Sequence, residues 1–325
     1  MGYTTANGDS DDLLDDIIAD TGWDVLSDVT TGDNRELWLE VPTTSTTFPY
    51  ALGFYRYSDG GSIESIRFNA ASAPTIALPW AAPSEVPFAE RLGGITDAEH
   101  PRILLTGAAF DYKFHWDADH IKIHVNSGGY HQFAYLGMLR PLGPSAENDD
   151  RYPYPLYLGG THYEDVIYNQ ALTDANYSWF LSPFLEGANV SGNSSGYLYC
   201  LGDWIPSQNR RRSGTYVTGT TSYHWFHPYA YVDMDGDATE DEITNFGSTL
   251  AGAPLVVPIS VIAHTGANNE VVVGTLRDTY FVACESATGA GPVAGDTVAV
   301  SAVTHNVVQN LTRASRYDVA IYKGA

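Results

Sequence analysis

The sequence predicts a mainly β protein, with antiparallel sheets in a sandwich-like arrangement and a small N-terminal α+β unit that contains one helix. Short runs in which apolar and polar residues alternate recur along the chain, as at Leu37, Leu39 and Val41. Turns rich in glycine, asparagine and proline separate these runs. Residues 11–20 carry the apolar spacing of an amphipathic helix. These observations favour many short strands over repeated helices.

Residues 1–73 are expected to form the α+β unit. Ser10 or Asp9 can cap its helix at the N-terminus, and Gly22 is expected to end the helix. One helix face carries the apolar residues Leu13, Leu14, Ile17 and Ile18. We expect this face to lie on an antiparallel sheet of about four strands. The strands are predicted at residues 23–29, 35–41, 50–57 and 63–69.

Two regions follow this unit. Residues 74–100 are rich in alanine and proline and predict an extended connection. Residues 101–250 predict a central β region, with strands at 103–106 and 112–116 and long loops whose many tyrosines and tryptophans hold them in place.

The central region is organised around a predicted hairpin. In residues 121–125, isoleucine and valine alternate with Lys122 and His124, so one face is expected to be apolar and the other hydrated. Residues 126–129 (NSGG) predict the turn, because glycine reaches positive φ without strain. The tyrosine- and proline-rich residues 152–157 follow, and we expect them to pack or dock against another surface.

Residues 251–325 predict a C-terminal β region. Its short apolar runs alternate with turns rich in glycine and asparagine. The strands are expected at residues 254–263, 271–276, 279–283, 297–303, 305–308 and 317–322.

The charge is strongly acidic. The chain has 39 acidic and 16 basic residues, a formal net charge of −23, and only three lysines, Lys113, Lys122 and Lys323. Such a surface would repel itself in dilute buffer, whereas molar salt shortens the Debye length to about 3 Å. We infer an extreme halophile or a virus of one; an acidic mesophilic protein is the alternative. Nucleic acid is excluded as a partner, because phosphate contacts need clustered cations, and the basic cluster at 210–212 is expected to pair with carboxylates.

The N-terminus and the cysteines carry information about location. The first residues, MGYTTANGDSDD, are polar and acidic, unlike a signal peptide. No apolar run approaches the roughly 18 residues of a membrane span, so no membrane insertion is expected.

Cys200 and Cys284 have no metal-binding spacing. They form either a disulfide or two buried thiols, with the thiols favoured.

One acidic loop predicts a cation site. Its carboxylates are separated by single residues around a glycine, an arrangement that can bring several oxygens to one Ca²⁺ ion. The candidate ligands are Asp233, Asp235, Asp237 and Asp241. The alternative is a solvated aspartate turn, common in so acidic a chain. No other cofactor is expected.

Other groupings point to catalysis or metal binding only weakly. His120 and His124 share a strand face, with His131 opposite across the turn, which could form a transition-metal site or an ordinary polar surface. Residues 192–196 (GNSSG) match the letters of a nucleophile elbow, but they precede a strand-like run instead of a helix. We therefore expect no enzymatic activity.

Three sets of segments, in order along the chain, resemble virion structural proteins of tailed bacteriophages. Near the N-terminus these are YTTA at 3–6, DLLD at 12–15, GW at 22–23 and REL at 35–37. In the centre they are YLGML at 135–139 and YPYPLYLGG at 152–160. Towards the C-terminus they are PLVVPI at 254–259, VGTLRDTYFV at 273–282, VVQNLTR at 307–313 and YDVA at 317–320. One departure is Asp278-Thr279, where the family has Asp-Gly.

The resemblance implies a non-enzymatic structural protein and supplies no catalytic residues. With the halophilic composition, it points to a tailed virus of haloarchaea, whose virion protein is made in the host cytoplasm. The expected position is the tail tip or baseplate, near host attachment, as a homo-oligomer in contact with other virion proteins. Alternatives are a capsid-vertex turret or decoration protein, and a receptor-recognition module that binds a host-surface glycan or glycoprotein.

Overall fold

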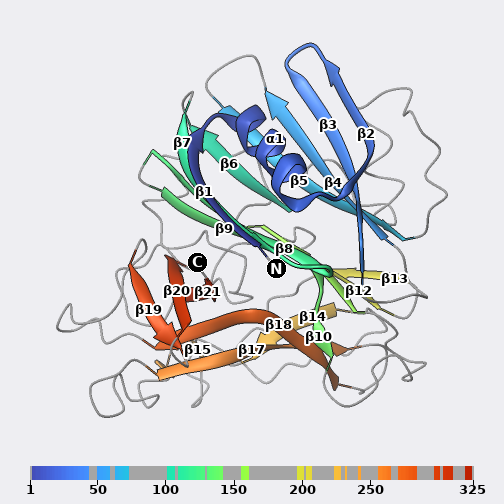
Figure 1. The fold of residues 1–325 in the computed structure, drawn as a ribbon. Coiled ribbons are helices and arrows are strands. Elements are labelled where there is room, and N and C mark those ends of the chain that lie inside the picture. The colour runs from blue at the N-terminus through green and yellow to red at the C-terminus, as the bar shows by residue number, and fades with distance from the viewer. Residues whose placement is uncertain are drawn as a thin grey trace.

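The computed structural model describes residues 2–43, 50–58, 63–72, 101–106, 109–128, 130–141, 155–160, 196–200, 203–206, 223–227, 231–232, 241–242, 255–264, 270–283, 296–300, 303–309 and 319–323. Strands dominate these residues, and α1 is the one helix among them. The mainly β fold expected from the sequence is confirmed. Three large antiparallel sheets, which we name A, B and C, lie one below another (Figure 1).

The order of strands shows that each sheet combines distant parts of the chain. Sheet B contains, in order, β2 (Asp24–Thr31), β3 (Asn34–Val41), β4 (Tyr50–Ser58), β5 (Ile63–Ser72) and β6 (Arg102–Thr106). Sheet A contains β1 (Gly2–Gly8), β7 (Phe110–Trp116), β8 (His120–Ser127), β9 (Tyr130–Met138), β11 (Leu156–Gly159), β12 (Gly196–Cys200) and β13 (Asp203–Pro206). Sheet C contains β14 (Tyr223–His227), β17 (Leu255–His264), β18 (Glu270–Ala283), β21 (Val319–Lys323), β20 (Val303–Gln309) and β19 (Thr297–Val300), and β10 (Arg140–Pro141) pairs with β18.

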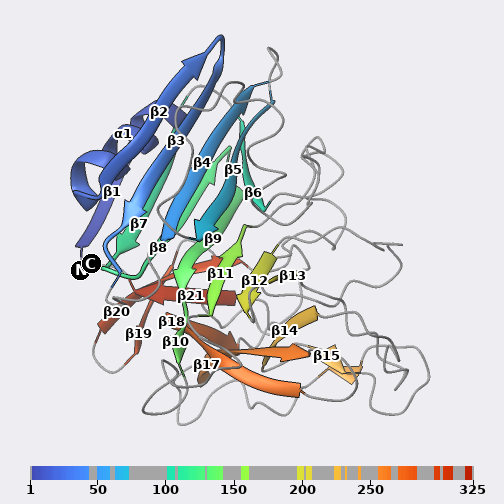
Figure 2. The ribbon, with the colours of Figure 1, turned by 90° about the vertical axis from the view of Figure 1, so that its right-hand side faces the viewer.

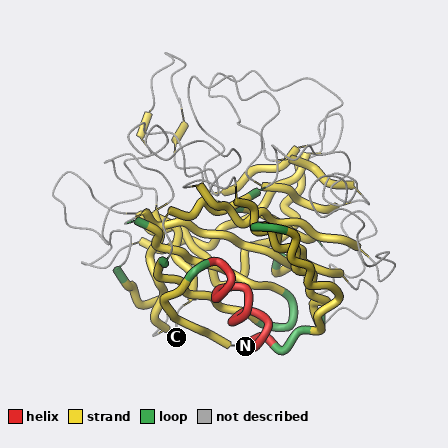
Figure 3. The backbone as a smooth tube through the Cα atoms, turned by 90° about the horizontal axis from the view of Figure 1, so that it is seen from above, coloured by secondary structure: helices red, strands yellow, loops and turns green. Residues whose placement is uncertain are grey.

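Helix α1 (Ser10–Thr21) forms where the sequence predicts it. The carboxylate of Asp9 accepts hydrogen bonds from the backbone amides of Asp11 and Asp12, which are helix donors without a partner inside the helix. Gly22 ends the helix in the left-handed conformation, with φ of 63°. The helix lies towards one margin of the strand layers, as the view from above shows (Figure 3).

Sheets A and B face each other across one apolar core, which we name the A–B core. Alternate residues of β3, β4 and β5 meet alternate residues of β7, β8 and β9 there, and the buried face of α1 joins them. Its largest groups are aromatic rings and its others are mainly leucine and isoleucine, among them Leu13, Ile17, Leu37, Leu52, Phe54, Phe68, Phe114, Ile121, Ile123 and Leu136. This core unites the N-terminal segment with the central region.

The opposite face of sheet A differs from the expectation that it would be hydrated. Lys122 and His120 on β8 are fully buried, and His124 is nearly so. These side chains alternate with Ile121 and Ile123 of the A–B core, so the strand is covered on both faces. Lys122 contacts the backbone of β18, which identifies sheet C as a cover of this face. We name this second contact the A–C interface.

The chain crosses directly from sheet A to sheet C. Strand β9 ends at Met138, and β10 begins at Arg140, which pairs with Thr275 of β18. Leu139 alone separates the two strands, and its amide donates to the carbonyl of Pro155 over 3.0 Å. Figure 2 shows β10 reaching down from β9 to the lower sheet.

Strand β18 is one strand with a large bulge, whereas the sequence predicted two strands at 271–276 and 279–283. Opposite β17, Tyr280 pairs with Pro258 and Thr275 pairs with Ser260, so residues 276–279 oppose Ile259 alone. Within the bulge, Asp278 has a φ of 45°, in the left-handed region that aspartate tolerates better than most residues. Such bulges redirect side chains out of the regular strand pattern.

The predicted boundary at residue 73 does not separate two sheets, because β6, after the connection, pairs with β5, and β1 belongs to sheet A. Residues 152–157 were expected to pack or dock against another surface. Of these, residues 155–157 are described. They lead into β11, an inner strand of sheet A in which Leu156 and Tyr157 are fully buried, so this part of the arm packs within the protein's own fold.

Candidate functional site

The best-defined polar cluster lies at the A–C interface, at the turn between β7 and β8. The carboxylate of Asp117 accepts hydrogen bonds from the backbone amides of Asp119 (2.7 Å) and His120 (3.1 Å). The same oxygen contacts Nδ1 of the His120 ring at 2.8 Å. A single aspartate therefore folds the turn, as Asx turns do, and orients the imidazole.

The protonation states of this pair follow from its surroundings. Burial lowers the pKa of His120 to about 4, against the opposing effect of Asp117, so the ring is neutral at pH 7. Burial alone would raise the pKa of Asp117, but its bonds from His120 and from the Asp119 amide lower it overall. Because the carboxylate only accepts, Nδ1 carries the proton. Nε2 makes no hydrogen bond within the described part of the chain.

Arg277 brings sheet C to this turn from the bulge of β18. Its guanidinium lies 3.0 Å from a carboxylate oxygen of Asp119 and 3.9 Å from one of Asp117. Its backbone amide donates to the hydroxyl of Tyr135 on β9 at 3.3 Å. The bulge therefore joins sheet A by a charged group and by its backbone.

Lys122 holds the same bulge from the other direction. Its ammonium group donates to the carbonyl of Arg277 at 3.0 Å and to that of Asp278 at 3.4 Å. Further along, Lys113 of β7 donates to the side-chain oxygen of Asn306 on β20 at 3.0 Å. Two of the chain's three lysines thus lie between sheets A and C.

Sheet B also reaches this cluster. The hydroxyl of Tyr50, at the start of β4, donates to the backbone carbonyl of Asp119, and Thr43 donates to the Asp119 carboxylate at 3.1 Å. Burial raises the pKa of Tyr50 and of Tyr135, so both stay neutral donors. Three sheets therefore meet at one turn.

Gly137 allows the close approach on which this geometry depends. It pairs with His120 and has a φ of 133°, and a Cβ there would lie 2.5 Å from both the carbonyl oxygen of Asp119 and Cα of His120. The amide of Met138 then donates to the Asp119 carbonyl at 2.8 Å. Gly137 is the glycine of the YLGML segment, so the resemblance includes a position that this packing requires.

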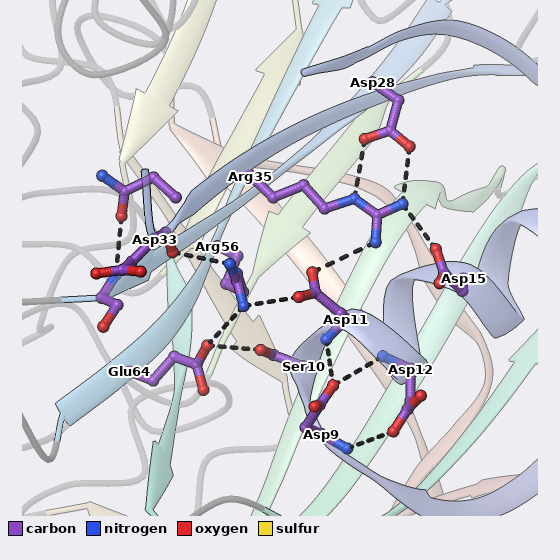
Figure 4. A network of polar contacts seen from close by, with 12 residues as sticks. Asp9, Ser10, Asp11, Asp12, Asp15, Asp28, Asp33, Arg35, Arg56 and Glu64 are labelled. Atoms are coloured by element: carbon purple, nitrogen blue, oxygen red, sulfur yellow. Dashed lines mark hydrogen bonds and ion pairs between the residues drawn. The ribbon is translucent and has the colours of Figure 1, made fainter. Parts of the chain in front are cut away.

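A second polar network lies around the start of α1 (Figure 4). Arg35 binds the carboxylate of Asp28 through two nitrogens, at 2.9 and 2.7 Å, and also contacts Asp15 at 2.7 Å. Arg56 contacts Asp11 at 2.8 Å. The hydrogen bond with Asp28 is the main cause that raises the pKa of Arg35. These pairs fasten α1 to sheet B and hold β2 against β3 within that sheet.

The predicted cation loop lies mostly outside the described residues. This applies to Asp233, Asp235 and Asp237, whereas Asp241 begins β16 (Asp241–Glu242), which pairs with β15 (Tyr231–Val232). Val232 and Asp241 are direct partners, so the two ends of the loop adjoin. The Ca²⁺ site stays a prediction.

The other predicted groups are placed as follows. His120 and His124 lie on the same face of β8, as expected, and His131 is the register partner of Asn126. Within the described ranges, no three histidine, cysteine, aspartate or glutamate residues form a group able to hold a metal ion. Cys200 ends β12, and Cys284 and the 192–196 motif lie outside the described residues.

The sequence analysis missed Asp117, Asp119 and Arg277. The spacing Asp117-Ala118-Asp119-His120 between two strands was the available signal for a carboxylate-folded turn. The Asp117–His120 pair has the composition of an acid–base dyad, but its imidazole is fully buried. The pair folds the turn, and Asp117 also lies 3.9 Å from Arg277 of sheet C.

No protein-family model and no curated protein matches this chain. Of the helices that the structure describes, none has the length and apolar character needed to cross a membrane.

Proposed function

We propose that the chain is a non-enzymatic structural protein of a tailed virus of haloarchaea, located at the tail tip or baseplate. The observation that carries this proposal is the position of the segments that resemble tailed-phage virion proteins. Their described residues lie in α1 and in strands, or directly beside them, and several of these residues connect two sheets. A resemblance in scattered surface loops would carry less weight, because framework positions determine the fold.

The N-terminal segments illustrate this. Tyr3 to Ala6 form the part of β1 that pairs with β7. Leu13 and Leu14 are fully buried in the A–B core. Arg35 is the centre of the ion pairs that hold α1 and β2.

The central and C-terminal segments meet at the A–C interface. Tyr135, from YLGML, accepts the hydrogen bond from the Arg277 amide, and Arg277 belongs to VGTLRDTYFV. Leu139 bonds to Pro155, which belongs to YPYPLYLGG. Segments separated by more than a hundred residues along the chain are thus direct partners, which supports the interpretation that they belong to one inherited framework.

The distribution of charge supports the halophilic part of the proposal. Among the described residues, Lys122 and Arg102 are fully buried, and Arg67 is nearly so. Arg35 is 10% exposed, while its partner Asp15 is 66% exposed. These basic groups therefore lie inside the protein while Asp15 faces the solvent, which suits a particle surface that must stay dispersed in concentrated salt.

The test is the oligomeric state in about 3–4 M NaCl, a range in which surface charge is screened. We expect light scattering and negative-stain images to show a closed ring or spike. Threefold or sixfold symmetry supports the tail, and fivefold symmetry would move the proposal to a capsid vertex. Dialysis to about 0.1 M NaCl should remove the circular dichroism signal of the folded state.

Two results would contradict the proposal. One is a protein that stays monomeric at every concentration in brine and hydrolyses a cell-wall polysaccharide. The other is a monomer that binds a host glycan tightly on an array, which would favour a recognition module over a structural component.

A further inference from the structure

The buried face of sheet A carries an unusual pairing of basic groups. Across the β7–β8 ladder, Lys113 lies directly opposite His124, and His115 directly opposite Lys122. All four lie on the face away from the A–B core, and both histidines are buried. Directly opposed residues have Cβ atoms about 5 Å apart, and like charges in such positions destabilise a sheet. This face of sheet A therefore already brings two lysines next to its buried imidazoles.

The surroundings of His120 oppose a positive charge on its ring. Burial and the cations Lys122 and Arg277 lower its pKa, whereas its contact with Asp117 raises it. A proton on His120 would therefore add positive charge in a fully buried place that already holds two cations. Burial of an uncompensated charge is strongly unfavourable.

We propose that the A–C interface is an acid-sensitive contact, in which protonation of the buried His120 of β8 releases sheet C from sheet A while the A–B core stays folded. This conformational response goes beyond the proposed structural role and does not depend on it. The molecule would open at one face of sheet A and stay connected through the short crossing at Leu139.

At low pH, the other groups packed on this cluster either weaken the A–C contact as well or have no effect on it. Protonation of Asp117 at still lower pH would remove one carboxylate partner of Arg277. Asp278 and Arg140 form their own pair at 3.6 Å, at the edge of the cluster. Tyr135 and Tyr50 stay neutral, because burial raises the pKa of each.

The A–B core has no comparable response, because leucine, isoleucine and phenylalanine make up most of its facing residues. The pH range follows from His120. Its pKa is about 4 in the folded protein and 6.5 for the ordinary side chain. As the pH falls, His120 therefore takes up its proton at a lower pH in the folded state than in the released state. The A–C contact weakens as the pH falls from 6.5 towards 4.

Hydrogen–deuterium exchange on the full chain in about 3 M NaCl tests this, with rates corrected for the intrinsic effect of pH. Between pH 7 and about pH 4.5 we expect the protection of the β18 amides to fall roughly 60-fold from His120 alone. The amides of β3 and β4 should keep their protection. Equal loss in β18 and β4 would overturn the proposal, since it would indicate ordinary acid unfolding.

Two variants and a control identify the responsible group. His120→Asn retains a donor towards Asp117 and cannot take up the proton, so it should abolish most of the acid response of β18. His305→Asn is the control, because His305 is equally buried on β20 but bonds to the carbonyl of Val303. An unchanged response in His120→Asn, or an equal loss in both variants, would contradict the proposal.

Should His120→Asn fail to fold, Lys122→Met gives an independent test. It removes a cation that lowers the pKa of His120, so this pKa should rise towards its ordinary value. The loss of β18 protection on acidification should then be smaller. A loss as large as in the wild-type protein would count against the proposal.

Discussion

The two faces of sheet A hold its neighbours by different physical means. Towards sheet B and α1, residues such as Ile121, Ile123 and Phe114 enter a continuous apolar core. Towards sheet C, Lys122 and the carboxylates of Asp117 and Asp119 meet the bulge of β18 through hydrogen bonds and ion pairs. One strand, β8, supplies both faces.

The difference between the faces has consequences for stability. Apolar contact stabilises the folded state by roughly 25 cal/mol for each Å² of apolar surface removed from water, and it does not depend on exact pairing of groups. Buried charges stabilise only while every partner is in place, and the loss of one partner leaves the other uncompensated. The A–B core should therefore tolerate changes of condition that separate sheets A and C.

The largest expected effect is on the A–B core. Phe114→Ala removes a fully buried ring that packs against Trp116, with centroids 5.3 Å apart. We expect the free energy of unfolding, measured with urea in brine, to fall by about 3–5 kcal/mol. Val25→Ala is the control, since Val25 is 45% exposed; it should change the value by less than about 0.5 kcal/mol. A similar small change for Phe114→Ala would contradict the core assignment.

The next effect concerns the A–C interface. Arg277→Met leaves Asp119 buried without its cation, which should cost about 3 kcal/mol and should increase amide exchange in β18 before that in β4. Arg140→Met is the matched control, because its side chain is 59% exposed and lies 3.6 Å from Asp278. Exposed pairs of this kind contribute about 1 kcal/mol or less. Equal costs for the two variants would show that burial does not strengthen the interface.

The smallest effect is local to α1. Asp9→Ala removes the side chain that accepts from two helix amides, so the free energy of unfolding should fall by about 1 kcal/mol. Asp33→Ala removes the same charge from a turn where only the Asp33 carbonyl contacts Arg56. Calorimetry should therefore distinguish the two variants. Identical melting temperatures would mean that the cap contributes nothing beyond its charge.

Features with local causes were predictable from the sequence. The helix begins after Asp9 and ends at Gly22, because capping and positive φ are properties of a few neighbouring residues. The hairpin of β8 and β9 follows from the alternation of residues 121–125 and from Gly128, which has a φ of 62°. Most strands of sheets B and C lie within a few residues of their predicted ranges.

Features with distant causes were not predictable. Alternation shows that Lys122 and Ile121 lie on opposite faces, but not that β18, 150 residues later, covers the lysine. The bulge of β18 was interpreted as a gap between strands, because its four residues break the alternation. Its partners lie at the turn of β7 and β8, so its role depends on contacts that no local pattern records.

A double-mutant cycle on Arg277 and Asp119 measures most directly whether paired buried charges hold sheet C. The single variants Arg277→Met and Asp119→Asn and the double variant are compared by urea unfolding in brine, with Arg140→Met and Asp278→Asn as the exposed control cycle. A coupling free energy of about 2 kcal/mol for the first pair, and near zero for the control, is expected. Additive single effects at Arg277 and Asp119 would contradict a charge-held interface.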